Sequence, residues 1–428
     1  MRTRPRLITL LFVLTLVLQI VPATAVTKSI AGTSCARAGL TKSANGLKFT
    51  CILSGKKLVW NKGEFTKKTI DPWSIHHKLV VVALTYSGDP GFWDEIPSLQ
   101  DLDAAGQLGD KLFFDFDVIG KWTWRDYLND SVDVAMSYWK RSTNNRLIFD
   151  APQIIYAPPG SAKKGENCNL LADAPVAMKY SGLKVLPKGG HIVSINPWRR
   201  CGTEGGMAEV RGNQISLIQI YALAHELGHN FGFGHAALLM CQDNNFATLP
   251  SSKCYSSEYG DQDDVMGSGF MTEGCSISAT NGTTLFGVPD AKDVVLGQVL
   301  TLNPNTSFKD VTVYRLKIDK IWYFFEYRSI IEGKDANGCY YAGAPGIELR
   351  ILGSKVRGND VNIMLIKQSS ENIADQLVRL NLESMEGTTR FVSGQTFNLP
   401  GTKNKYRLKV MSVEPDNAKF TVEKVLQP

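Results

Sequence analysis

The feature that most constrains this chain is the segment Ala224–Ala236, which carries the pattern H-E-x-x-H-x-x-G-x-x-H. On a helix, His225 and His229 lie on one face because they are four residues apart, so both imidazoles can bind the same ion. Glu226 lies about 100° further round the helix, beside that ion. The opposite face is apolar, with Ile220, Leu223, Leu227 and Phe231. The segment therefore predicts a helix with one packing face and one metal-binding face.

The second half of the pattern supplies a third ligand. Gly232 can end the helix because glycine reaches left-handed dihedrals at little steric cost, and the chain can then return His235 to the same ion. Three neutral imidazoles leave one position open on zinc, which is the catalytic arrangement. A zinc-bound water with a pKa of roughly 7 can attack a carbonyl while Glu226 takes its proton and returns it to the leaving amine. A buried helix with incidental histidines is the alternative, and the presence of Gly232 and His235 in register argues against it.

The remaining histidines are not expected to bind the ion. His191 lies in the apolar run Gly190–Ile195 and is interpreted as a strand residue. His76 and His77 are interpreted as residues of a linker.

A later segment makes the chain resemble the metzincin zinc peptidases. Glu258–Gly267 opens with Glu-Tyr-Gly-Asp and ends with Asp-Val-Met-Gly, which is similar to the gametolysin-like secreted metallopeptidases. Cys201 and Gly202, followed by Gly206–Val210, resemble the approach to the active-site helix in that family. The resemblance covers residues 75–300.

The resemblance implies roles for residues outside the histidine pattern. Met266 is expected to form a hydrophobic floor beneath the metal, without being a ligand. Some metzincins have a tyrosine two residues after this methionine, whereas this chain has Ser268, so no tyrosine contribution is implied here. The family's strand before the active-site helix runs along the cleft edge and pairs with substrate, which makes 192–195 the candidate for that strand.

The fold class expected is an α/β (α+β) metzincin-type catalytic domain, followed by an all-β sandwich-like domain and preceded by a small disulfide module. The regions are a signal peptide at 1–25, a cysteine-paired module or pro-segment at 26–70, the zinc peptidase domain at 71–300 and the accessory domain at 301–428. Residues 1–25 combine a basic start, an apolar run shorter than a spanning helix needs and a small-residue cleavage pattern. They predict export, with an uncleaved anchor as the alternative.

Export favours disulfides among the eight cysteines, because the compartment is oxidising. Sequence does not fix the connectivity, and local pairing alone suggests Cys35 with Cys51, Cys168 with Cys201, Cys241 with Cys254, and Cys275 with Cys339. Leu47–Leu53 and Lys57–Trp60 are expected to form a hairpin stapled by the first pair. Whether this module is a pro-segment or binds a surface stays open.

Periodicity predicts the other elements. Leu79–Leu84 is an aliphatic run suited to a strand buried on both faces, Arg125–Arg141 has helical spacing, and 146–156 is expected to be a strand. The chain from His235 to Met266 is expected to be loop-like, and the aspartates 261, 263 and 264 suit turns better than a calcium site.

Beyond residue 301, alternating segments predict a β-sandwich. They are Val311–Ile318, Trp322–Arg328, Gly346–Ile351, Val361–Ile366, Tyr406–Val413 and Lys419–Val425. Glu326 and Arg328, which lie inside an aromatic strand, are interpreted as a structural ion pair, with substrate contact as the minority alternative.

Together these patterns predict a secreted zinc metalloendopeptidase that hydrolyses extracellular or cell-wall proteins or peptides. The alternative is a non-catalytic adhesion or carbohydrate-binding protein with a relic zinc site, and the retention of all three ligands and Glu226 argues against it. A net charge of +6 without a basic block gives no indication of a nucleic-acid partner. After signal cleavage no membrane partner is expected, while binding to a cell surface or matrix through the flanking modules stays open.

Overall fold

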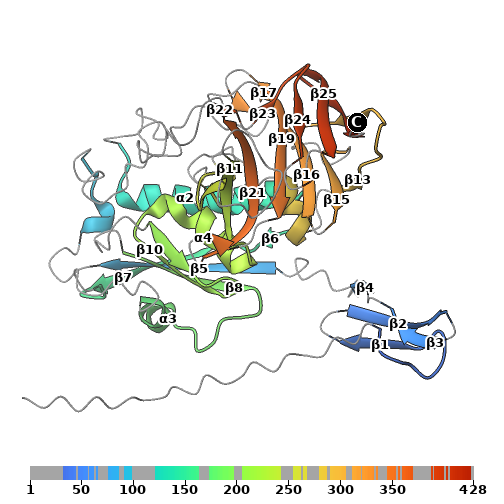
Figure 1. The fold of residues 1–428 in the computed structure, drawn as a ribbon. Coiled ribbons are helices and arrows are strands. Elements are labelled where there is room, and N and C mark those ends of the chain that lie inside the picture. Colours follow the sequence, from blue (N-terminus) through green and yellow to red (C-terminus); the bar gives the residue numbers. More distant parts are fainter. Residues whose placement is uncertain are drawn as a thin grey trace, which may run out of the picture. The chain divides into compact units, whose positions relative to one another are not determined.

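The computed structural model describes residues 32–44, 47–55, 57–61, 64–65, 76–85, 91–98, 121–162, 173–196, 205–241, 254–261, 264–267, 279–286, 290–304, 311–319, 321–331, 334–335, 345–352, 355–356, 359–369, 387–388, 390–399, 402 and 405–425. The chain divides into two compact units, Met1–Asp71 and Pro72–Pro428. The described residues form a mixed α/β structure with several sheets and few helices (Figure 1). The expected signal segment 1–25 lies outside them. No described helix has the length and apolar character needed to cross a membrane.

The first unit is a small antiparallel sheet. Its strands are β1 (Thr41–Ala44), β2 (Leu47–Ser54), β3 (Lys57–Trp60) and β4 (Glu64–Phe65), and β2 pairs with each of the others. The predicted hairpin and the Cys35–Cys51 disulfide are both confirmed. Phe49 and Cys51 are buried, whereas most other described residues are exposed or half-buried. The disulfide therefore supplements a core that is too small to stabilise a unit of this size alone.

The second unit begins with a six-stranded sheet. Its strands are β5 (His76–Thr85), β6 (Ile148–Phe149), β7 (Gln153–Pro159), β8 (Gly190–Ile195), β9 (Gly206–Ala208) and β10 (Gln214–Leu217). The order is β6-β5-β8-β10-β9, with β7 also paired to β5. All of the pairings are parallel except that of β9 with β10. The strands predicted over 79–84 and 190–195 are thereby confirmed.

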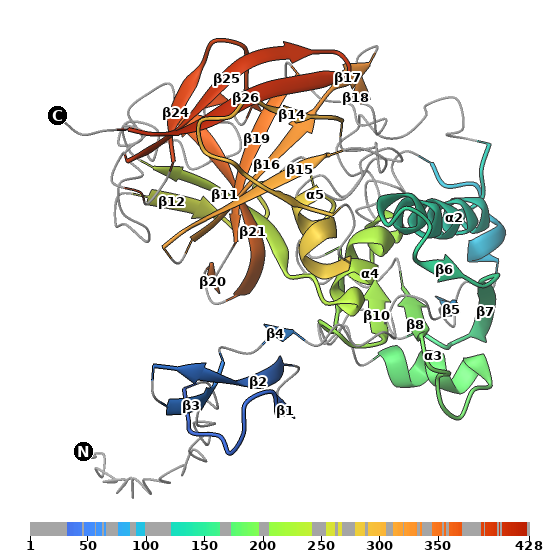
Figure 2. The same ribbon diagram turned by 90° about the vertical axis from the view of Figure 1, so that its right-hand side faces the viewer.

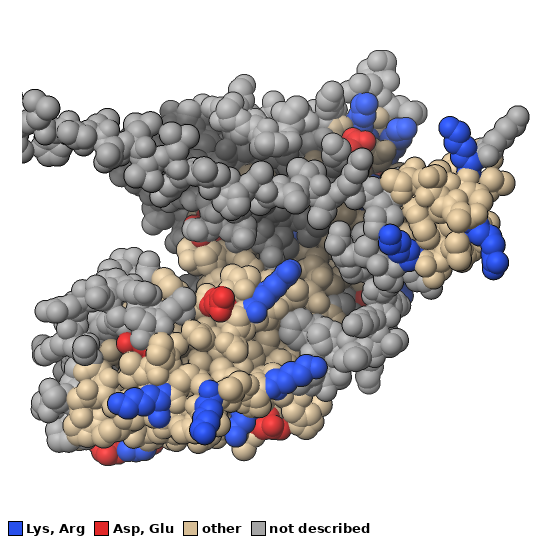
Figure 3. Space-filling model, turned by 90° about the horizontal axis from the view of Figure 1, so that it is seen from below, with Lys and Arg blue, Asp and Glu red and all other residues tan. Residues whose placement is uncertain are grey.

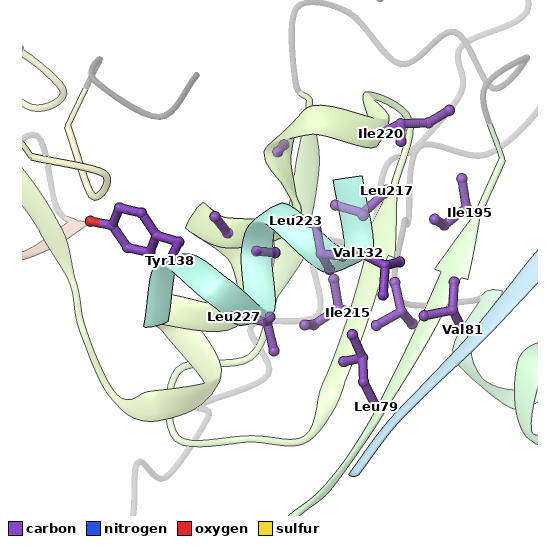
Figure 4. Close-up of a cluster of buried hydrophobic side chains, with 14 of the residues drawn as sticks. Leu79, Val81, Val132, Tyr138, Ile195, Ile215, Leu217, Ile220, Leu223 and Leu227 are labelled. Carbon is purple, nitrogen blue, oxygen red and sulfur yellow. The ribbon is translucent and has the colours of Figure 1, made fainter. Parts of the chain in front are cut away.

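Helices cover both faces of this sheet. The helices α2 (Trp124–Ser142) and α4 (Leu223–Phe231) pack together and share one core with Leu79, Val81 and Ala83 of β5. The helix α3 (Ala174–Ser181) shares a second core with Val80, Val82 and Leu84. Alternate side chains of β5 thus enter opposite cores, which explains its unbroken aliphatic sequence. Figure 4 shows the first core, in which Leu223 and Leu227 of α4 lie in one cluster with Val132 of α2 and Ile215 of β10.

The predicted helix over 125–141 is confirmed as α2, and its ends have clear causes. Thr123 caps its start, because its hydroxyl accepts from the backbone N–H of Asp126 while the Asp126 carboxylate accepts from the Thr123 backbone N–H. Lys140 and Arg141 lie in the last turn, where positive charge is favoured by the helix dipole. Asn144 and Asn145 then turn the chain with φ of 51° and 60°.

The interpretation of His76 and His77 as linker residues is wrong. Both belong to β5, and His77 is only 6% exposed. Its Nδ1 lies 3.0 Å from Nε2 of His191 on the neighbouring strand β8. A polar residue at the start of a strand can be buried when another polar side chain satisfies it, and that pairing is not visible in the local sequence.

The described residues of the rest of the second unit form a separate two-stranded sheet and two more extensive sheets that face each other (Figure 2). The larger has the order β12-β11-β21-β19-β16-β15-β13, and the smaller has the order β14-β26-β25-β24. Residues of both sheets contribute to one core, including Phe325 from the larger and Phe420 from the smaller, whose rings stack 5.2 Å apart. This is the sandwich-like arrangement that the alternating segments predict.

The strands of the larger sheet are β11 (His235–Cys241), β12 (Cys254–Ser257), β13 (Lys292–Asp293), β15 (Val313–Ile318), β16 (Ile321–Arg328), β19 (Gly346–Leu352), β20 (Lys355–Val356), β21 (Asn359–Ser369), β22 (Gly387–Thr388) and β23 (Arg390–Phe391). Those of the smaller are β14 (Leu300–Leu302), β24 (Thr396–Asn398), β25 (Tyr406–Glu414) and β26 (Asn417–Lys424), and β17 (Ile330–Ile331) pairs with β18 (Lys334–Asp335). Short helical turns complete the unit at η1 (Phe92–Asp94), η3 (Ile220–Ala222), α5 (Ala279–Asn281) and η5 (Gly282–Phe286).

The structure corrects the expectation that the chain from His235 to Met266 is loop-like. His235 opens β11, which pairs antiparallel with β12 and parallel with β21 over His235–Met240. Ala237 and Leu239 of β11 belong to the core shared by the two facing sheets. A strand from the expected catalytic region is therefore built into the sheet formed mainly by residues after 301, so the boundary expected at residue 300 does not separate the sheets.

Candidate metal centre

The helix α4 carries the first two histidines and Glu226. Its apolar face packs on α2, and the indole Nε1 of Trp139 donates to the carbonyl oxygen of Ala224 at 2.9 Å. The helix ends at Gly232, as the sequence predicts, with φ of 106°, which is in the left-handed region. The backbone N–H of Arg211, in the β9–β10 turn, donates to the carbonyl of His229 at 2.8 Å and satisfies one of the last helical acceptors.

The turn at Gly232 brings the third histidine to the first two. One nitrogen from each of His225, His229 and His235 lies within 4.8 Å of the others, close enough for one ion to reach all three. The His229 ring centroid lies 4.9 Å from each of the other two, and His225 and His235 are 5.6 Å apart. Among the described residues these histidines form a group that could hold a metal ion.

Each histidine has one ring nitrogen fixed by an acceptor. Nδ1 of His225 donates to the carbonyl oxygen of Val265 at 2.7 Å, and Nδ1 of His229 donates to that of Phe233 at 2.8 Å. Nδ1 of His235 donates to a carboxylate oxygen of Glu258 at 2.6 Å. Because carbonyls and carboxylates only accept, each Nδ1 carries the proton and each Nε2 keeps its lone pair. The three Nε2 lone pairs are the ligand atoms that a metal ion needs. The acceptors of the Nδ1 hydrogen bonds orient the three rings.

Burial keeps these imidazoles neutral. It lowers the pKa of His225 well below its ordinary value, and the neighbouring His229 and His235 lower it further. Burial and His235 lower the pKa of His229 to about 4. Burial also lowers the pKa of His235, whereas the hydrogen bond to Glu258 opposes this shift. At neutral pH the three rings are therefore uncharged and able to coordinate a cation.

Glu226 is held between α4 and the edge strand β9. It is 5% exposed, and a Cβ added at Gly206 would lie 2.9 Å from its Cγ and its Oε1. Only a glycine at this position of β9 lets the carboxylate lie against the strand. Glu226 follows His225 directly, so its carboxylate is on the helix that also carries two of the three ring donors.

Met266 packs against α4. It is fully buried, and a Cβ added at Gly228 would lie 2.2 Å from its sulfur. Its carbonyl oxygen accepts from the backbone N–H of Ala236 at 2.8 Å, next to His235. The segment that carries Met266 therefore contacts both the helix and the start of β11.

Two residues of this segment were not predicted as site residues. Glu258 orients His235, and the ring of Tyr259, which is 41% exposed, lies 4.1 Å from that of His235. Both belong to the Glu-Tyr-Gly-Asp run used for the resemblance. The carboxylate of that run was the available signal, because a metal-binding histidine commonly donates its second ring N–H to a carboxylate. Ser268 lies outside the described residues.

The structure accounts for the other candidate residues as follows. His191 is a strand residue, as predicted, and its Nδ1 lies 3.0 Å from the side-chain oxygen of Asn230. Asp264 accepts from the backbone N–H of Met266 at 2.8 Å, which is the turn role expected of it, and Asp261 pairs with Arg350. Glu326 and Arg328 form the predicted buried ion pair, with 3.7 Å between oxygen and nitrogen.

The remaining cysteines can be placed only in part. The backbones of Cys241 and Cys254 are directly opposite each other in the β11–β12 pairing. The predicted partners Cys168 with Cys201 and Cys275 with Cys339, and also Asp263, lie outside the described residues.

Comparison with known proteins gives no relatives: no family model matches the chain, and neither a curated protein nor a solved structure matches it. The chemistry of the site therefore has to be argued from its own residues.

Proposed function

We propose that the protein is a secreted zinc-dependent endopeptidase that hydrolyses peptide bonds of extracellular or cell-wall proteins. The observation that carries the proposal is the set of three neutral histidines whose Nδ1 atoms are all engaged, with Glu226 beside them on α4. His225, His229 and His235 would hold the ion. When bound, zinc would lower the pKa of a water molecule to about 7 and polarise a substrate carbonyl.

The protein's own residues would then move the proton and hold the substrate. The Glu226 carboxylate would accept a proton from the attacking water and transfer it to the nitrogen of the leaving amine. Its burial against Gly206 restricts it to one position and limits access of bulk water. Three ligand histidines together with an intact acid–base residue favour an enzyme over a binding protein with a relic site.

The strand expected to pair with substrate has to be revised. The candidate at 192–195 is β8, which lies inside the sheet between β5 and β10 and is entirely buried. β9 is the last strand of the sheet order and lies against Glu226 through Gly206. An extended peptide added to the outer edge of β9 would present its carbonyls beside that carboxylate, so β9 takes this role in the proposal.

Replacing Glu226 by glutamine tests the proposal. The Glu226→Gln variant is expected to bind one zinc per chain, because the three ligands are retained. Its hydrolysis of a quenched peptide should fall by about 10²–10⁴-fold, because the general base is lost. Zinc content and hydrolysis are measured on the same preparation, with the wild-type protein as control. A variant that keeps its zinc and hydrolyses at the wild-type rate would sink the mechanism.

A further inference from the structure

A buried cluster of charged side chains lies between the candidate metal centre and the large sheet. This sheet contains β11 together with strands that follow residue 301. The members of the cluster are at most 5% exposed and comprise three carboxylates and three guanidinium groups: Asp261, Glu326, Glu348, Arg328, Arg350 and Arg390. The opposite charges balance, which is the condition under which such groups are tolerated in an interior. We call this set the arginine–carboxylate cluster.

Arg350 of β19 reaches the segment 258–267, which we call the metal-site segment, at Asp261. Its Nη2 donates to both carboxylate oxygens of Asp261, at 3.0 and 3.2 Å, and its Nε donates to one of them at 3.2 Å. Its Nη1 bonds to Glu326 and, at 2.5 Å, to Glu348. One planar guanidinium thus joins a carboxylate of the metal-site segment to two carboxylates of the sheet, a geometry that a lysine cannot reproduce.

Asp261 lies between the start of β11, which carries His235, and the Met266 turn, whose Val265 carbonyl orients His225. Its N–H points to the carbonyl oxygen of Ala236 at 3.3 Å, directly after His235. Its own carbonyl packs so closely on Gly267 that a Cβ there would lie 1.9 Å from the oxygen. Ala236 in turn donates to Met266 at 2.8 Å. A displacement of Asp261 would therefore also displace the start of β11 and the Met266 turn.

A second connection runs from the same cluster to the Met266 turn. Glu326 accepts from the backbone N–H of Thr280 at 2.9 Å, and the adjacent Asn281 donates to Asp264 at 3.0 Å. Asp264 accepts from the N–H of Met266 at 2.8 Å. The carbonyl before Met266, on Val265, is the acceptor that orients His225. The turn is thus tied to the sheet at Asp261 and at Asp264.

We propose that Arg350 is a positioning residue of the metal centre, acting through Asp261. By fixing Asp261 it fixes the segment whose Val265 carbonyl orients His225 and whose Glu258 carboxylate orients His235. The proposal rests on the proposed function only in taking these histidines as zinc ligands. It assigns the large sheet a part in building the site, in addition to its part in stability.

Three variants separate positioning from stability. Arg350→Lys keeps the positive charge and loses the planar fork, and Asp261→Asn keeps the shape of the acceptor and loses its charge. Arg390→Lys is the matched control, because Arg390 is buried in the same cluster and pairs with Glu348 at 3.2 Å. The zinc Kd is measured by competition with a chelator, and Co²⁺ replaces zinc for an absorption spectrum that reports ligand geometry. Amide hydrogen exchange at Ala236 is followed in the metal-free protein.

Arg350→Lys and Asp261→Asn are expected to raise the zinc Kd by about 10–100-fold, as changes to groups that orient ligands generally do. They should also shift the Co²⁺ spectrum and speed exchange at Ala236. Arg390→Lys should lower the unfolding transition while leaving all three quantities at their wild-type values. If Arg350→Lys does not fold, Asp261→Asn decides the question alone.

The proposal is overturned if Arg350→Lys and Asp261→Asn bind zinc as the wild type does and leave exchange at Ala236 unchanged. It is also overturned if Arg390→Lys changes these quantities equally, because the cluster would then act only through stability. A wild-type protein that cleaves no peptide would contradict the proposed function, whereas zinc affinity and Ala236 exchange would still decide the role of Arg350.

Discussion

At the scale of single residues, the hydrogen bond made by Nδ1 of each histidine determines that Nε2 keeps the lone pair that can bind a metal ion. Three acceptors fix the proton on Nδ1 of the three rings: the carbonyls of Val265 and Phe233 and the carboxylate of Glu258. The motif alone places the histidines, but it does not specify these partners, because two of them come from the segment after β11. Only Glu258 carries a charge, so it is the partner whose loss is easiest to measure.

Replacing Glu258 by glutamine should weaken zinc binding. The amide can still accept from His235, but it no longer supplies the negative charge that makes the imidazole a better donor. A rise of about 10–100-fold in the zinc Kd is expected, measured by chelator competition. Glu423→Gln changes an exposed carboxylate on β26 and serves as control. An unchanged Kd in Glu258→Gln would show that the His235 contact does not tune the site.

At the scale of elements, a chain of buried polar side chains links β5, β8 and α4. His77 donates to His191, His191 donates to the side-chain oxygen of Asn230, and the Asn230 amide donates to the carbonyls of Glu209 and Gln214. Because the side-chain nitrogen of Asn230 donates, its side-chain oxygen accepts the hydrogen bond from His191. His191 therefore carries its proton on Nδ1, and His77 also carries its proton on Nδ1. Both histidines are neutral in this arrangement.

This series of hydrogen-bonded side chains predicts that the free energy of unfolding falls in mild acid. Burial, and then His191, lower the pKa of His77 from 6.5 to about 4, and burial lowers that of His191. Between pH 4 and pH 6.5 the unfolded protein therefore binds more protons than the folded protein does. The contribution of His77 is fully present above pH 6.5 and is lost as the pH falls toward 4, by roughly 2–3 kcal/mol.

Denaturant unfolding of the metal-free protein at pH 7 and pH 4.5 measures this effect. Wild type should lose more stability over the interval than His77→Gln, by roughly 2–3 kcal/mol. The comparison removes the contribution of the ligand histidines, which titrate in both proteins. Equal losses in the two proteins would mean that His77 does not carry the effect.

Elements with strong periodicity were predictable from the sequence, and elements defined by distant partners were not. Helical spacing gave α2 and α4, and unbroken aliphatic runs gave β5 and β8. β11 was missed because the polar residues after Cys241 dominate its neighbourhood, and its parallel partner β21 begins at Asn359. The edge role of β9 depends on sheet order, which local sequence does not determine.

At the scale of the whole molecule, the strand that begins with His235 belongs to a sheet formed mainly by residues after 301. The sequence predicts a catalytic domain that ends at 300 and an accessory sandwich after it, whereas β11 lies between β12 and β21. Figure 3 shows one face of the molecule, on which described Lys and Arg side chains are spaced apart by other residues. The core shared by the two facing sheets and the arginine–carboxylate cluster are both buried.

Removing the C-terminal strands should therefore abolish the site. A fragment of residues 72–300 would lose β21 and expose Ala237 and Leu239, so it is expected to show no cooperative unfolding and no stoichiometric zinc binding. Residues 72–428 should retain both properties, and circular dichroism with zinc titration compares the two fragments. If the shorter fragment binds one zinc as tightly as the longer one, the site does not need the large sheet.

If the three histidines and Glu226 make this chain a zinc peptidase, the purified protein should cleave members of a broad quenched-peptide library. Hydrolysis is measured before and after a zinc chelator is added, and again after zinc is added back. Cleavage should disappear with the chelator and return with zinc. A protein that binds one zinc per chain and cleaves nothing, also after proteolytic removal of residues 26–70, would show that the chain is not a zinc peptidase.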